Sequence, residues 1–170
     1  MRLDRLLPFA LLASAACVFA SELQTTFKVQ TSAGQAFCLL SASDRHHYAL
    51  LVLAIFAAGL AFVALVTGSK PAATAAAIAG VVSLLIFLII DLPHANQVGT
   101  LGTACNPAAQ DFDAKAVPQA GFWLELVGSV SLALTTVALA TLSTEQLRDI
   151  APKPLRRWGQ RPGSDGAEAP

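Results

Sequence analysis

Residues 48–67 read YALLVLAIFAAGLAFVALVT, twenty consecutive positions without a charged side chain. The hydrocarbon core of a bilayer is about 30 Å thick, and an α-helix needs about 20 apolar residues to cross it. Lipid offers the backbone amides no water to bond, so a helix must satisfy them within the segment. This stretch therefore predicts a membrane-spanning helix and makes a membrane protein the first hypothesis for the chain.

Two further stretches have the same character. Ala72–Ile90 carries no charge, and Gln119–Leu142 is interrupted only by Glu125. Neither shows the alternation of apolar and polar residues that membrane β-barrel strands require. Of the 170 residues 55 % are hydrophobic and 13 % charged, which is about half the charge of a typical soluble domain. Helices in lipid account for this composition.

The first apolar segment, Leu6–Ala20, allows more than one interpretation. It is short, and Arg2 and Arg5 precede it, an arrangement that is also typical of a secretory signal peptide cleaved after Ala20. A lipoprotein anchored at Cys17 is a third alternative. We expect a retained helix over about residues 4–23, and the cleaved form stays open at this point.

The basic residues predict the orientation, because Lys and Arg in short loops favour the cytoplasmic side. Eight of the eleven Lys and Arg residues fall in three regions that lie on one side of a four-helix chain: Arg2, Arg5, Lys70, Arg148, Lys153, Arg156, Arg157 and Arg161. Both termini are therefore expected in the cytoplasm.

We expect one domain, residues 1–150, with spans at about 4–23, 48–67, 72–91 and 119–142. Residues 143–150 extend the last helix, and residues 151–170 have the composition of a disordered cytoplasmic tail.

The two long loops are then extracytoplasmic. The first alternates apolar and polar residues around residues 32–35, which suits a short β-hairpin. Cys38 lies in the first loop and Cys105 in the second, on the side where disulfides persist. We expect a Cys38–Cys105 disulfide that ties the loops together; the alternative is two unrelated cysteines.

Ionisable side chains gather at the outer ends of the expected helices. These are the weak candidates for a metal site: His46, His47, Asp91, His94 and Glu125. Ionisable groups within a span are costly and are candidates for function. Imidazole and carboxylate suit Zn²⁺ or Cu²⁺, and histidine also responds to acidity. The structural alternative is an Arg45–Glu125 ion pair that locks two helices together, and both interpretations stay open.

Small residues at helical spacing, such as Gly80, Gly121 and Gly128, predict close helix packing. The inner halves of the spans hold few polar residues, which argues against conduction. Zero net charge argues against nucleic-acid binding, and we find neither a nucleophile–base pairing nor a cofactor motif. We therefore expect an all-α transmembrane four-helix bundle in the plasma membrane, a non-enzymatic accessory or interaction component of a membrane complex without a cofactor. The lipid bilayer and other membrane proteins are its expected partners. The alternative is a proton- or metal-responsive sensor or transporter.

The layout of four spans, inside termini and a disulfide outside resembles claudins and tetraspan proteins, although their Trp, Gly-Leu-Trp and Cys-Cys-Gly motifs are absent. The stretches SASDRHHYALLVL (41–53) and GFWLELVG (121–128) are similar to small uncharacterised bacterial four-helix membrane proteins. This resemblance implies a fold and a bacterial plasma membrane, and it implies no activity.

Overall fold

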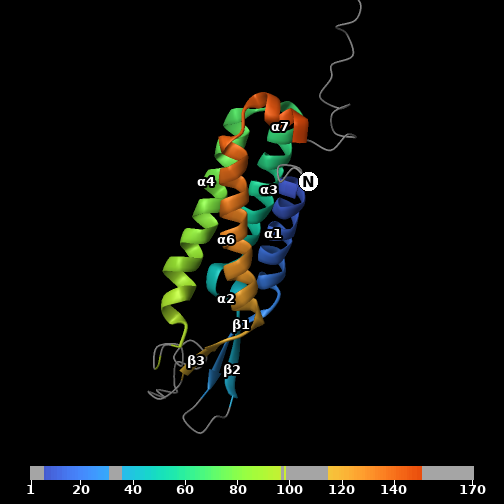
Figure 1. The fold of residues 1–170 in the computed structure, drawn as a ribbon. Helices are drawn as coiled ribbons and strands as arrows, with labels where there is room; N and C mark the ends of the chain where they lie inside the picture. Colours follow the sequence, from blue (N-terminus) through green and yellow to red (C-terminus); the bar gives the residue numbers. More distant parts are fainter. Residues whose placement is uncertain (1–5, 31–35, 97, 99–114, 151–170) are drawn as a thin grey trace, which may run out of the picture.

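The computed structural model describes residues 6–30, 36–96, 98 and 115–150 (Figure 1). Its elements, in chain order, are α1 (Leu7–Glu22), β1 (Thr25–Gln30), β2 (Ala36–Ser41), α2 (Ala42–His46), α3 (Ala49–Thr67), α4 (Lys70–Ile86), the π-helix η2 (Phe87–Asp91), the 3₁₀-helix η3 (Leu92–His94), β3 (Lys115–Pro118), α6 (Ala120–Thr141) and α7 (Thr144–Ile150). The helices α1, α3, α4 and α6 run side by side, with a small sheet at one end and α7 at the other. The expected tail and Cys105 lie outside the described residues.

Three of the helices are long and apolar enough to cross a membrane: Ala49–Thr67, Lys70–His94 and Ala120–Thr141. Each carries large apolar side chains that are exposed on the outside of the bundle, among them Ile55, Ile78 and Leu134. Apolar side chains on an outer surface are stable when lipid rather than water surrounds them. The spans predicted at about residues 48–67, 72–91 and 119–142 are thereby confirmed as helices of membrane length.

The first segment forms α1, which packs along α6 and α3. It has 16 residues, fewer than the roughly 20 that a helix perpendicular to the membrane needs. Its Val18 is fully buried, and a Cβ atom added to Gly128 of α6 would lie 2.9 Å from the Val18 backbone nitrogen. The segment is thus part of the helical core, while a fourth span stays a prediction.

The sheet has the strand order β2-β1-β3 and is antiparallel throughout. The expected hairpin is confirmed as β1 and β2. The third strand was not expected: β3 comes from the second long loop and pairs Val29 of β1 with Ala116. The protein is therefore mostly helical with a small sheet rather than purely all-α. A strand of four residues that ends in proline has too little pattern of its own to be recognised before its partner is known.

An aromatic core seats the sheet on the bundle. The Phe122 ring of α6 lies 5.5 Å from the Phe27 ring of β1 and 5.2 Å from the Phe87 ring of η2, centroid to centroid. A Cβ atom on Gly121 would lie 2.7 Å from the Thr25 carbonyl oxygen, so only glycine permits this contact between α6 and β1. The small residue expected at this position is confirmed as a close-packing site.

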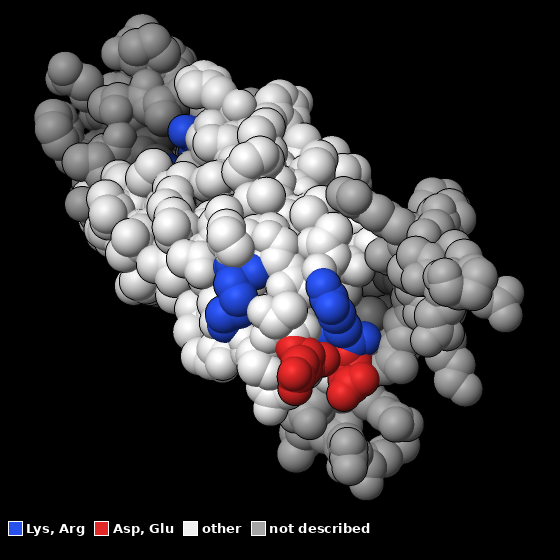
Figure 2. Space-filling view, turned by 90° about the horizontal axis from the view of Figure 1, so that it is seen from above, with Lys and Arg blue, Asp and Glu red and all other residues white. Residues whose placement is uncertain are grey.

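At the opposite end, basic side chains satisfy the free carbonyls of helix ends. Lys70 Nζ donates to the carbonyl oxygens of Ala140 at 2.7 Å and Leu142 at 2.5 Å, and Arg148 donates to the carbonyl oxygen of Thr67. Figure 2, seen from this end, shows basic and acidic side chains close together. The expected extension of the last helix is wrong in one respect, because the chain breaks at Leu142 and α7 starts as a separate helix.

Candidate functional site

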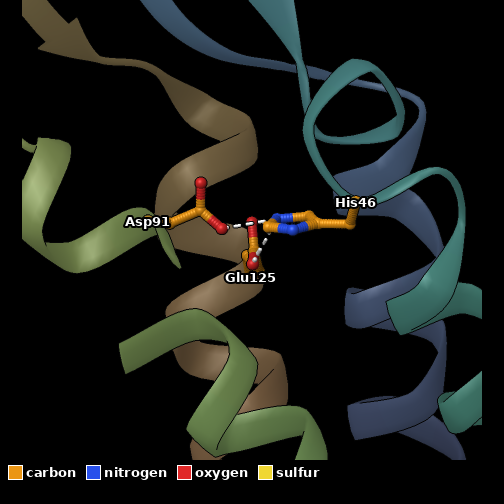
Figure 3. Close-up of side chains that lie close together, drawn as sticks. All are labelled: His46, Asp91 and Glu125. Carbon is orange, nitrogen blue, oxygen red and sulfur yellow. Dashed lines mark ion pairs between the residues drawn. The ribbon is translucent and has the colours of Figure 1, made fainter. Parts of the chain in front are cut away.

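Three ionisable side chains from three separate segments meet beneath the sheet (Figure 3). His46 ends α2, Asp91 ends the π-helix η2, and Glu125 lies in the second turn of α6. Their side chains are completely buried and point toward one another. Because the segments are far apart in sequence, only the tertiary fold brings these residues together.

The His46 ring is shared between the two carboxylates. Its Nε2 atom lies 2.5 Å from Asp91 Oδ2 and 3.5 Å from Glu125 Oε1. The Glu125 and Asp91 carboxylates also contact each other. His46 Nδ1 has no hydrogen-bond partner among the described residues. Buried polar atoms in proteins are normally hydrogen-bonded, so this cluster has unused capacity for a ligand.

Arg45 holds Asp91 from the other side. Its Nε atom lies 2.7 Å from Asp91 Oδ1, its Nη2 atom donates to the Ile90 carbonyl oxygen at 2.9 Å, and its guanidinium lies 5.2 Å from the centre of the Phe27 ring. The expected Arg45–Glu125 pair is therefore corrected: Arg45 pairs with Asp91, and Glu125 pairs with His46. Arg45 still joins α2 to the end of the α4 segment and to the sheet.

The other two histidines do not join the trio. His47 is exposed although it follows His46 directly, as expected for neighbours that point about 100° apart. His94 Nδ1 lies 3.1 Å from Arg45 Nη2 and 2.5 Å from the Ile90 carbonyl oxygen, so it contacts the arginine. Of the five expected candidates, the structure brings together His46, Asp91 and Glu125.

Irregular backbone surrounds the cluster. The last turn of the α4 segment, Phe87–Asp91, is a π-helix, a rare form that is frequent at functional sites. His47 and Tyr48 both adopt the left-handed conformation, with φ of 49° and 64°, which is uncommon for residues other than glycine. The left-handed residues separate α2 from α3 directly after His46, and the π-helix ends at Asp91.

A third buried carboxylate was not predicted from the sequence. Glu22, the last residue of α1, is 1 % exposed. Its carboxylate interacts with His46 and Asp91 through their charges and lies near the first-turn amides of Leu50 and Leu51 in α3. A helix N-terminus favours a negative charge. The only signal in the sequence was an acidic residue at the end of an apolar run, which more commonly marks the end of a helix at the membrane surface.

The carboxylates around His46 favour its charged form. Burial disfavours the charged form of His46, but hydrogen bonds and charge interactions with Asp91 and Glu125 outweigh burial and raise its pKa to about 9. Charged groups buried in proteins are normally paired, and here the cationic His46 and Arg45 side chains face the Asp91 and Glu125 carboxylates.

Polar groups do not continue from the cluster through the rest of the described helices. The buried hydroxyl groups there donate to carbonyl oxygens of their own helix one turn earlier: Ser14 to Ala10, Ser83 to Ala79, Ser129 to Leu126 and Thr136 to Leu132. A conduction path requires continuous polar lining. The geometry of the cluster suits binding of a cation better than transport of a cation across the membrane.

Cys17 is a free thiol, whereas Cys38 in β2 is disulfide-bonded. Its expected partner, Cys105, lies outside the described residues, so the Cys38–Cys105 pairing stays a prediction. Comparisons of the chain with protein-family models, with curated proteins and with solved structures find no match.

Proposed function

We propose that this chain is a multi-pass plasma-membrane protein that acts as a non-enzymatic accessory or interaction component of a membrane complex. In this proposal four helices cross the bilayer, both termini are cytoplasmic, and the sheet faces outward. The distribution of basic residues supports the orientation, because Lys70 and Arg148 lie at the end opposite the sheet.

The observation that carries the proposal is the way the sheet is presented. The aromatic core and Arg45 fix β1 to the ends of the helices, and β2 is an edge strand among the described residues. β3 is the other edge, but Val98 forms a bridge with Lys115 there. Leu39 of β2 is 62 % exposed. An exposed edge with an apolar side chain can pair with a strand from another protein.

Site-specific crosslinking in native membranes tests this role. A photoreactive amino acid replaces Leu39, and in the control it replaces Ile55, which is exposed to a similar degree on α3. We expect Leu39 to give a discrete protein adduct and Ile55 to give lipid adducts alone. Equal products at both positions, or no protein adduct at Leu39, would contradict a role of the sheet in protein contact.

A second candidate function is a proton- or metal-responsive sensor or transporter, and the convergence of His46, Asp91 and Glu125 favours it. Response is better supported than transport, because the described helices lack a polar path below the cluster. Glu125→Gln keeps the shape of the side chain and removes its charge. The variant is expected to change cation binding or the response to acidity; unchanged metal content, pH response and stability would exclude this function.

A further inference from the structure

We propose that His46 Nε2, Asp91 Oδ2 and a Glu125 carboxylate oxygen bind one divalent transition-metal ion of the zinc class at the outer end of the bundle. The inference deepens the second candidate function and is independent of the proposed role of the sheet. It rests on the geometry and burial of the donor atoms and on the contacts that hold the donors in place.

The donor atoms have the spacing of a metal site. One donor from each of the three residues lies within 4.8 Å of the others. Nitrogen and oxygen ligands bind Zn²⁺ tetrahedrally at about 2.0–2.2 Å, so two such ligands lie about 3.3–3.6 Å apart. The 3.5 Å between His46 Nε2 and Glu125 Oε1 already fits. Asp91 Oδ2, at 2.5 Å from His46 Nε2, would withdraw by about 1 Å to admit the ion.

The Asp91 and Glu125 carboxylates are completely buried, and a buried carboxylate is stabilised by a cation beside it. A divalent ion that binds here takes the position at His46 Nε2, and a proton on that atom leaves to solvent.

Neighbouring groups orient the donors as partners of metal ligands commonly do. Arg45 Nε occupies Asp91 Oδ1 at 2.7 Å and leaves Oδ2 directed at the ion position. Arg45 itself is fixed by the Ile90 carbonyl and the Phe27 ring. Three protein ligands leave the fourth position of a tetrahedral ion for water.

The donor set also selects the class of ion. One imidazole and two carboxylates suit Zn²⁺ and related transition ions. Ca²⁺ requires six to eight oxygen ligands, and the cluster offers fewer. We therefore expect Ca²⁺ and Mg²⁺ to leave bound Zn²⁺ in place.

The test uses the full chain, purified in mild detergent without an affinity tag, stripped with a chelator and reloaded with Zn²⁺. Elemental analysis is expected to find one zinc per chain, with a higher thermal midpoint than that of the stripped protein. Co²⁺ in place of Zn²⁺ is expected to give the visible absorption of a four-coordinate nitrogen and oxygen site. Glu125→Gln and His46→Gln are expected to weaken binding at least tenfold.

The matched control is His47→Gln, which changes the exposed neighbouring histidine and is expected to bind zinc as the natural chain does. Binding by the natural chain that is no stronger than binding by Glu125→Gln would overturn the inference. So would an equal loss in His47→Gln, because it would indicate surface binding. Measurements on the natural chain test the site even where a variant does not fold. If the natural chain binds no zinc and gives no cobalt spectrum, the proposed site is wrong. A Leu39 adduct without zinc would leave the interaction role intact, and zinc without an adduct would leave the metal site intact.

Discussion

Gly80 illustrates how single residues set the distance between helices. A Cβ atom at this position would lie 2.4 Å from Thr136 Oγ1 and 3.2 Å from the Leu132 carbonyl oxygen. In Gly80→Ala either the Thr136 side chain or the spacing of α4 and α6 must shift, and overpacking of this kind costs about 1–3 kcal/mol. The control is Gly59→Ala, because a Cβ atom at Gly59 meets nothing within 4 Å and alanine favours the helix. Thermal unfolding in detergent is expected to show a loss for Gly80→Ala and none for Gly59→Ala; equal midpoints would contradict this packing.

Arg45 is the residue on which the buried charges depend. Arg45→Gln leaves Asp91 without its guanidinium partner, and removal of one member of a buried ion pair costs about 3–5 kcal/mol. The control is Arg148→Gln at the other end, where an exposed side chain donates to a carbonyl and its loss costs about 1 kcal/mol or less. Unfolding in detergent measures both, and a smaller effect for Arg45→Gln than for Arg148→Gln would show that the cluster does not hold the fold together.

At the scale of elements, the sequence did not decide whether α1 is a retained helix or a cleaved signal peptide. Val18 of α1 fits against Gly128 of α6, and Glu22 joins the buried charges. Cleavage after Ala20 would remove most of this packing. We therefore expect the intact mass of the protein extracted from membranes to include residues 6–20, and a mature chain that starts at Ser21 would contradict the observed core.

The two outer loops are a second test at this scale. Cys38 lies in β2, and a bridge to Cys105 would fasten the second loop to the sheet, with a stabilisation of about 3–5 kcal/mol in the chain-entropy model. Cys38→Ser and Cys105→Ser are then expected to lower the unfolding midpoint equally, and the double variant no further. Peptide mapping without reductant is expected to recover the linked pair. Unequal losses, or a Cys38 linkage to another peptide, would exclude this pairing.

At the scale of the whole molecule, some features could be predicted from the sequence and others could not. Length and apolarity predicted the helices of membrane length, because lipid permits only helices and closed barrels and these stretches lack the alternation of barrel strands. The predicted spans also placed the candidates Asp91 and Glu125 at the same depth, near the outer ends of their helices. The pairing of Arg45, the third strand β3 and the burial of Glu22 depend on contacts between distant segments. No local pattern encodes them, and the π-helix that positions Asp91 likewise has no signature of its own in FLIID.

Both functional proposals depend on one claim about the whole molecule, that the sheet and the cluster beneath it face the outside. Cysteine labelling with a membrane-impermeant maleimide tests this claim most directly. Lys115→Cys places a thiol on the exposed start of β3, and Glu145→Cys places one on the exposed face of α7; the unsubstituted chain gives the background. In intact cells we expect Lys115→Cys to be labelled, and Glu145→Cys to be labelled only after permeabilisation. Labelling of Glu145→Cys in intact cells, with Lys115→Cys protected, would contradict the account.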